Sequence, residues 1–199
     1  MPITVLPLNS DQATQRFYEV VWPHRAVILR AARIQTGNDA EAEDLAQETL
    51  LKAFKAIGDF RAGTHIKAWL LTILRNTRID RLRTAAGSAK HSSLDELVSE
   101  PAALDAGQES DPEAWQNPEE MLAAFSDQVV IEALNQISED LRWALLLVDV
   151  EGLDQEQAAE LMEVPLGTVK SRLHRGRAAL RTSLLPHARG IRLVRERNG

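Results

Sequence analysis

The chain has 199 residues, 44% of them hydrophobic and 26% charged, which is typical of a soluble globular protein with room for one medium domain or two small ones. It contains no cysteine, which excludes disulfides and thiolate metal sites, and its net charge of -6 gives no overall cationic excess for nucleic acid. No apolar run is long enough to span a membrane and the first residues lack a signal-peptide pattern, so we expect a cytoplasmic protein without membrane insertion.

Helices are predicted from the start of the chain, without a convincing strand pattern. The first is expected over Ser10 to Gln35 and to end near Gly37, and the second begins at Asp39, where acidic residues suit the first turn. The second helix carries a polar stripe next to its apolar side, made of Asp44, Gln47, Glu48, Leu51 and Lys55. Spacing alone favours a solvated surface, whereas an exposed leucine within the stripe indicates docking to a partner helix.

A loop with two glycines follows at 58–65, and a cation-rich helix is predicted from Ile66 to about Thr84. An irregular loop before such a helix is typical of a site for single-stranded DNA, because unstacked bases can enter pockets at the loop. Outside its buried stripe, the helix carries the cations Lys67, Arg75, Arg78, Arg81 and Arg83, with Asn76 at the margin of the stripe. For the aromatic rings of Phe60 and Trp69 the favoured alternative is a place in the core.

Charge is segregated along the chain. Residues 61–90 hold seven Lys/Arg and one acid, residues 168–199 hold nine and one, and residues 91–127 hold ten Asp/Glu and no Lys or Arg. Two basic segments predict two surfaces that face nucleic acid, since the local field governs contacts with phosphates. The acidic segment is interpreted as an extended linker, either an inert tether or a strand that runs through a basic channel of a partner or mimics nucleic acid.

Residues 151–181 predict a helix-turn-helix. A short helix over about Asp154 to Met162 is followed by a turn at 163–167, where proline and glycine break the helix. The second helix buries one stripe, made of Val169, Leu173, Gly176 and Leu180. The opposite ridge comprises Ser171, His174, Arg175 and Ala178, and its flanks comprise Thr168, Lys170, Arg172, Arg177 and Arg181.

That ridge between two rows of cations suits a helix in the DNA major groove, with base edges under the ridge and phosphates at the flanks. An ordinary amphipathic helix with a solvated basic face is the alternative. The preceding helix and the turn of suitable length favour DNA binding.

Two long segments carry a resemblance to a known family. DAEAEDLAQETLLKAFKAIGDFRAGTHIKAWLLTILRNTRIDRLR, followed by ISEDLRWALLLVDVEGLDQEQAAELMEVPLGTVKSRLHRGRAAL, resembles the extracytoplasmic-function sigma factors of bacterial RNA polymerase. The combination of DLAQE, AWL…RN and GTVKSR in this order makes the resemblance specific. It implies an all-α fold of two small helical domains, a helical bundle termed sigma region 2 and a helix-turn-helix termed sigma region 4, joined by a flexible linker.

The resemblance also implies roles for the candidate residues. Asp44, Gln47, Glu48 and Leu51 would dock on the core polymerase. Phe60, Arg61, Gly63, Thr64, His65, Arg75, Asn76 and Arg78 would bind the -10 promoter element. Ser171, His174 and Arg175 would meet bases of the -35 element, and Thr168, Lys170, Arg172 and Arg177 its backbone.

The domain organisation expected on this basis has four parts. Residues 1–90 would form region 2, 91–127 the acidic linker, 128–185 region 4, and 186–199 a basic C-terminal tail with four arginines. The tail would either add nonspecific affinity for DNA or have no role.

The implied function is that of a sigma factor that binds core polymerase, recognises both promoter elements and promotes DNA melting. Its implied partners are the clamp of the largest polymerase subunit, the flap of the second-largest subunit, promoter DNA and an anti-sigma factor. No enzymatic activity, metal or cofactor is expected, because no constellation of catalytic or ligating residues occurs. The alternative is a stand-alone helix-turn-helix transcriptional regulator, which leaves DLAQE and the basic AWL…RN helix unexplained.

Overall fold

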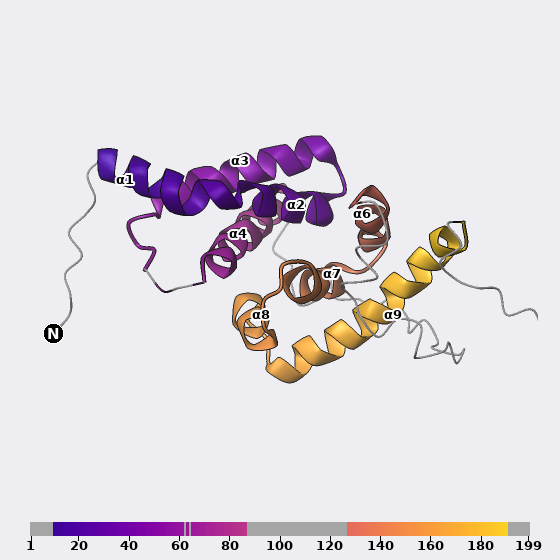
Figure 1. Cartoon of the computed structure of the whole chain (residues 1–199). Coiled ribbons are helices and arrows are strands. Elements are labelled where there is room, and N and C mark those ends of the chain that lie inside the picture. Colours follow the sequence, from indigo (N-terminus) through magenta and orange to yellow (C-terminus); the bar gives the residue numbers. More distant parts are fainter. Residues whose placement is uncertain (1–9, 62, 64, 87–126, 191–199) are drawn as a thin grey trace, which may run out of the picture.

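The protein is all-helical over the residues that its structure, a computed structural model, describes: 10–61, 63, 65–86 and 127–190. Two groups of helices lie side by side, one from each end of the sequence (Figure 1). We refer to residues 10–86 as the N-terminal module and to residues 127–190 as the C-terminal module. The linker expected at 91–127 lies outside the described residues except for Asp127, which begins a helix.

The first helical stretch departs from the uninterrupted α-helix expected over 10–35. It comprises α1 (Ser10–Arg16), a π-helical turn η1 (Phe17–Val21), a 3-10 turn η2 (Trp22–His24) and α2 (Arg25–Thr36). Pro23 explains the break, because it has no N–H for the regular ladder and is tolerated only where a new helical segment begins. The expected end is confirmed: Gly37 has a φ of 69° and its N–H donates to the Arg33 carbonyl.

The other two helices of the N-terminal module pack on α2. α3 (Asp39–Lys55) is capped by Asn38, whose side chain accepts a hydrogen bond from the Glu41 N–H. α4 (Ile66–Ala86) crosses below α2 and α3 (Figure 1). Their shared core consists of aliphatic side chains such as Ile28, Leu45 and Leu70. The module is therefore a small helical bundle, as expected.

The C-terminal module has four helical parts. They are α6 (Asp127–Asn135), α7 (Glu139–Leu145) continued by a π-helical turn η4 (Leu146–Val150), α8 (Gln155–Met162) and α9 (Leu166–Gly190). α9 includes Pro186 and continues to Gly190, so the first residues of the expected tail belong to this helix. Residues 191–199 lie outside the described residues.

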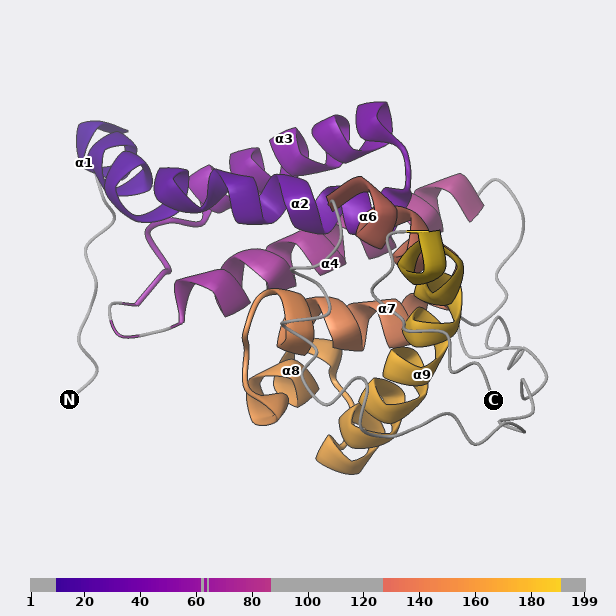
Figure 2. The same ribbon diagram turned by 45° about the vertical axis from the view of Figure 1, so that its right-hand side comes forward.

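The two modules are in contact. α2 packs on α6 and α7, and α4 packs on α8, so that segments far apart in sequence meet along one interface (Figure 2). The linear pattern of two modules and a linker did not predict this contact.

Candidate nucleic-acid interface

α8 and α9 form the predicted helix-turn-helix. Asp154 and Gln157 form a capping box at the start of α8. The Asp154 carboxylate accepts a hydrogen bond from the Gln157 N–H at 2.7 Å, and the Gln157 side-chain oxygen accepts one from the Asp154 N–H at 3.2 Å. The turn differs in detail from expectation. Its left-handed residue is Glu163, with a φ of 58°, whereas Gly167 lies within the first turn of α9.

The buried stripe of α9 is confirmed, because Val169, Leu173 and Leu180 are all at most 2% exposed. Gly176 belongs to this stripe for a reason that the sequence did not show. A Cβ at this position would lie 3.1 to 3.3 Å from side-chain carbons of Leu145 on α7. Glycine therefore permits the close approach of α9 to α7.

The opposite side of α9 faces solvent. Lys170, Ser171, His174 and Arg175 are exposed, and Thr168 is partly buried near the start of the helix. The Ser171 hydroxyl donates to the Thr168 carbonyl at 2.9 Å, so it is already satisfied without a ligand. The exposed ridge that we expected to face base edges is thus present as a surface.

Two of the flanking arginines of α9, Arg172 and Arg177, have carboxylate partners within the module. Arg172 Nη2 lies 2.6 Å from Asp140 Oδ2, and Arg177 makes two hydrogen bonds to Asp149, at 3.0 and 2.7 Å. The bond to Asp149 raises the pKa of the Arg177 guanidinium above its usual value, against the effect of burial. These arginines hold α9 on α7 and η4, whereas Lys170 and Arg175 present their charges to solvent.

The loop between α3 and α4 combines a buried anchor with exposed residues. Phe60 is 7% exposed, its ring centroid lies 5.0 Å from that of Trp69, and its carbonyl accepts a hydrogen bond from Arg16 of α1. Its ring therefore belongs to the core, which was the favoured alternative. Arg61, Gly63 and His65 are exposed. Thr64 lies outside the described residues.

The cationic residues of α4 do not share one environment. Asn76 is exposed. Arg78 is only 17% exposed and pairs with Glu139 of α7 at 2.9 Å, and Arg75 Nη2 lies 3.4 Å from the Met162 carbonyl of α8. Two of the three candidate -10 residues on α4 are thus directed at the C-terminal module.

The polar stripe of α3 is at the surface. Asp44 and Gln47 are exposed and the side chain of Leu51 is 54% exposed. Glu48 accepts from Arg81 of α4 at 2.7 Å, and this bond, assisted by Lys52, holds the pKa of the Glu48 carboxyl below its usual value. Arg81 also donates a hydrogen bond to the Asp44 carbonyl at 2.8 Å, so this residue of α4 contacts both the backbone and a side chain of the α3 stripe.

Comparison with known proteins bears on both modules. Residues 21–87 match the family model of sigma-70 region 2, and residues 127–180 match that of sigma-70 region 4. The ECF RNA polymerase sigma factor SigE of Mycolicibacterium smegmatis is 33% identical over 186 residues, covering 92% of this chain and 68% of that protein. The RNA polymerase sigma-H factor of Pseudomonas aeruginosa is 36% identical over 146 residues, covering 73% of this chain and 74% of that protein.

Solved structures show the same architecture. The sigma factor RpoE of Bartonella quintana, in complex with the anti-sigma factor NepR, matches with a TM-score of 0.59 and 31% identity, covering 86% of this chain and 95% of that one. CnrH, in complex with the cytosolic domain of CnrY, matches with a TM-score of 0.54 and 23% identity, covering 88% and 95%. Within the described residues, no helix is both long enough and apolar enough to cross a membrane.

Proposed function

Since the chain belongs to the extracytoplasmic-function group of sigma-70 family sigma factors, we propose that its two modules divide promoter recognition between them. The C-terminal module, region 4, binds the duplex -35 element, and the N-terminal module, region 2, binds the core polymerase and the -10 element. The polymerase supplies the chemistry of RNA synthesis.

Binding of the -35 element is supported by the exposed ridge of α9. Ser171, His174 and Arg175 can reach base edges in the major groove, while Lys170 and the Thr168 hydroxyl lie toward a phosphate wall. Arg172 and Arg177 are held by Asp140 and Asp149. We assign them chiefly to the orientation of α9, with Arg177, 42% exposed, still able to approach a phosphate.

Binding of the -10 element is supported by the loop before α4 and by α4 itself. Arg61, Gly63 and His65 are exposed on a loop whose Phe60 anchor holds it against the bundle, and Asn76 is exposed further along α4. Captured bases offset the cost of opening the duplex, which is about 1–2 kcal/mol for each stacked step.

Core binding is assigned to the α3 stripe. Asp44, Gln47 and Leu51 form an exposed surface with a polar rim and an apolar contact, the composition of a helix-docking site. The Arg81 bridge from α4 keeps that surface in a fixed orientation.

The observation that carries the proposal is the conjunction, in one chain, of a region 2 match with an exposed docking stripe and a region 4 match with an exposed recognition ridge. Run-off transcription tests it. Core RNA polymerase with this protein should initiate at promoters selected from genomic fragments by the holoenzyme, and core polymerase alone should not. Identical start sites with and without the protein would refute the assignment, and DNA binding without a requirement for polymerase would favour a stand-alone regulator.

A regulatory partner follows from the same family. RpoE of Bartonella quintana was solved with its anti-sigma factor. We therefore propose that an anti-sigma protein also sequesters this chain. Affinity purification of the tagged protein from uninduced cells should recover such a partner in stoichiometric amount, and its absence under all growth conditions would contradict this part of the proposal.

A further inference from the structure

Two exposed aromatic rings lie where the first helical stretch of region 2 changes its hydrogen-bond register. Tyr18 and Trp22 are 57% and 41% exposed, and the other aromatic residues that the structure describes are buried or partly buried. Neighbouring exposed rings of this size make an apolar patch, and such patches mark interaction sites. None of the surfaces assigned above includes this pair.

The turns η1 and η2 place both rings on one side of the chain. Phe17 and Val21 are buried, and the residue that follows each of them, Tyr18 or Trp22, is exposed. The Trp22 N–H donates to the Phe17 carbonyl, five residues earlier, and Pro23 follows directly. The ring centroids of Tyr18 and Trp22 lie 5.7 Å apart, so the two rings form one surface.

These rings are held in position by aromatic contacts that begin in the core. Phe17 packs edge-on against Phe54 at the end of α3, with ring centroids 5.4 Å apart, and Tyr18 and Trp22 lie 5.8 and 6.4 Å from Phe17. The guanidinium carbon of Arg25 lies 5.1 Å from the centroid of the Trp22 ring, and Nη1 donates to the Trp22 carbonyl at 3.1 Å. A cluster fixed in this way loses little side-chain entropy when a flat ligand stacks on it.

The cluster adjoins the loop that we assign to the -10 element. Arg16, the last residue of α1, donates to the Phe60 carbonyl, and its guanidinium carbon lies 6.0 Å from the centroid of the Phe60 ring. Both overall views show the loop leaving α3 beside the junction of α1 and α2 (Figure 1, Figure 2). The Phe60 ring is buried and closed to a base, whereas the rings of Tyr18 and Trp22 are open to one.

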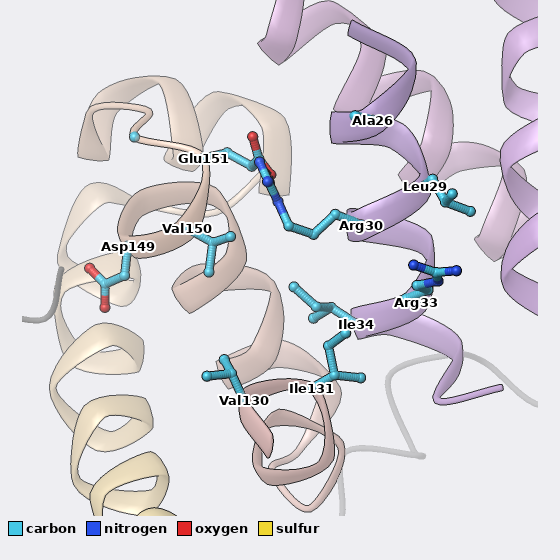
Figure 3. A pocket seen from close by; sticks show the side chains of 11 residues that line it. Ala26, Leu29, Arg30, Arg33, Ile34, Val130, Ile131, Asp149, Val150 and Glu151 are labelled. Atoms are coloured by element: carbon cyan, nitrogen blue, oxygen red, sulfur yellow. Dashed lines mark hydrogen bonds and ion pairs between the residues drawn. The ribbon is translucent and has the colours of Figure 1, made fainter. Parts of the chain in front are cut away.

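A groove further along α2 lacks these properties. It has a volume of about 580 Å³, and the described residues that line it, from α2, α6 and the end of η4, include no aromatic ring. Figure 3 shows two of its charged side chains, Arg30 and Glu151, directed at each other, with 2.7 Å between Nη2 and Oε1. Because base stacking needs an aromatic face, the cluster at η1 suits single-stranded DNA and this groove does not.

We propose that Tyr18 and Trp22 form a stacking surface for bases of the unpaired non-template strand that adjoin those held by the loop at 58–65. The inference rests on the proposed binding of the -10 element at that loop and adds a subsite on η1. Exposed Arg25 and Arg61 accompany the rings, and the acid between the rings, Glu19, accepts a hydrogen bond from the Gln15 side chain at 2.9 Å. Since stacking tolerates any base, this surface lengthens the strand that region 2 holds and adds little sequence preference.

The test uses holoenzyme assembled from core polymerase and the full chain. The probe is a labelled non-template oligonucleotide that spans the -10 element of a promoter identified by run-off transcription. In a series of such oligonucleotides, a single abasic site is placed at each position flanking the element, which removes one base and keeps its phosphate. At the position that stacks, the abasic site should lower the affinity of the unmodified holoenzyme at least about fivefold, the low end for a base–aromatic stack.

Two double variants show whether these rings are the partners of that base. Tyr18→Leu with Trp22→Leu keeps apolar side chains and removes the aromatic faces. It should bind the intact oligonucleotide at least about fivefold more weakly and should show no further loss at the abasic site, because the stack is already missing. Tyr18→Phe with Trp22→Phe keeps an aromatic face at both positions and should retain the preference for the intact oligonucleotide.

The stacking surface and the proposed function fail in different ways. With promoter-dependent transcription by the unmodified holoenzyme, an absent abasic penalty, or an equal penalty in the unmodified and leucine proteins, would overturn the stacking surface alone. A leucine variant that loses affinity for core polymerase, measured by competition with a labelled sigma factor, while its abasic penalty stays unchanged would show that the rings contact a polymerase subunit instead. A holoenzyme that starts no promoter-dependent transcripts would overturn the proposed function and the inference with it. If circular dichroism shows that the leucine double variant does not fold, the single variants Tyr18→Leu and Trp22→Leu decide the question by the same comparison.

Discussion

At the scale of single residues, ion pairing separates four cations of α9 into two groups. Arg172 and Arg177 are bound by Asp140 and Asp149, whereas Arg175 and Lys170 are exposed. A helix in a groove needs both a fixed orientation and free donors. The paired arginines fix the orientation of α9, and the exposed residues provide hydrogen-bond donors for DNA.

Substitution of the exposed pair should distinguish base contacts from phosphate contacts. Arg175→Ala should weaken binding to a matched -35 duplex by about 1–3 kcal/mol and relax base preference, because it removes a donor to base edges. Lys170→Ala should weaken binding evenly across sequences and reduce the salt slope by about one. Fluorescence anisotropy with matched and scrambled duplexes at several salt concentrations measures both effects; equal behaviour of the two variants would show that the groove orientation is wrong.

Gly176 and Gly167 form a matched pair of glycines on α9. Alanine at 176 would place a Cβ 3.1 Å from Leu145 Cγ, and Leu145 is buried, so we expect a net loss of about 1 kcal/mol despite better helix propensity. A Cβ at Gly167 would meet no atom within 4 Å, and alanine there should stabilise the fold by about 0.4–1 kcal/mol. Urea unfolding of both variants checks the signs, and equal stabilisation would exclude a tight α7–α9 contact.

At the scale of elements, each functional surface depends on a neighbouring element for its position. The α3 stripe is braced by Arg81 of α4, the loop at 58–65 is anchored by Arg16 of α1, and α8 is fixed at its start by Asp154. Element boundaries and caps therefore decide how the surfaces are presented.

The α3 stripe should be separable from folding. Asp44→Ala combined with Gln47→Ala should reduce affinity for core polymerase, measured by competition with a labelled sigma factor, and leave thermal unfolding unchanged, because both side chains are exposed. Asp11→Ala, at an exposed acid of α1, is the control for lost charge. Unchanged polymerase affinity in the double variant would contradict the docking assignment.

The capping box of α8 should contribute measurably to region 4. Asp154→Ala removes the acceptor of the Gln157 N–H and should destabilise the fold by about 1 kcal/mol, whereas Asp154→Asn retains an acceptor and should cost less. Chemical denaturation gives both values. A smaller loss for the alanine variant than for the asparagine variant would exclude a role for the side-chain oxygen.

At the scale of the whole molecule, the two modules share an interface in which guanidinium groups reach carboxylates and backbone carbonyls. Arg142 is the most connected of these, since it also donates to Asn135 at 2.8 Å and to the Ile137 carbonyl at 3.3 Å. It thereby joins α6, α7 and the end of α2. Unfolding of one module is expected to affect the other as long as these contacts persist.

Replacement of Arg142 should uncouple the modules. Arg142→Met keeps much of the side-chain volume and removes the donors to α2, leaving buried carbonyls unpaired at a cost of about 1–3 kcal/mol. Calorimetry should then resolve two unfolding transitions for this variant, whereas we expect a single transition for the unmodified chain. Arg83→Met, at an exposed arginine near the end of α4, should retain the single transition.

Sequence patterns were sufficient to predict the main helices and the protein family, because helical periodicity and short motifs are set by residues that lie close together in the sequence. The helix-turn-helix, the buried stripe of α9 and the exposed Asp44 and Gln47 are all confirmed as structural features. The break at Pro23 was missed, because a helical turn can change its hydrogen-bond register without altering the apolar spacing. The left-handed residue of the turn was also missed, since Glu163 adopts a conformation that glycine usually takes.

By itself, the sequence determined that this chain is an all-helical sigma factor with two modules, since local periodicity and the order of short motifs survive any arrangement in space. Only the tertiary structure showed which of the cations compared below form ion pairs with carboxylates of other elements. Arg78, Arg172 and Arg177 look alike in sequence to Arg175, yet the first three are paired with Glu139, Asp140 and Asp149, residues of other elements. Ion pairs across elements depend on how helices pack, and no spacing along one helix encodes the charge that another helix brings to it.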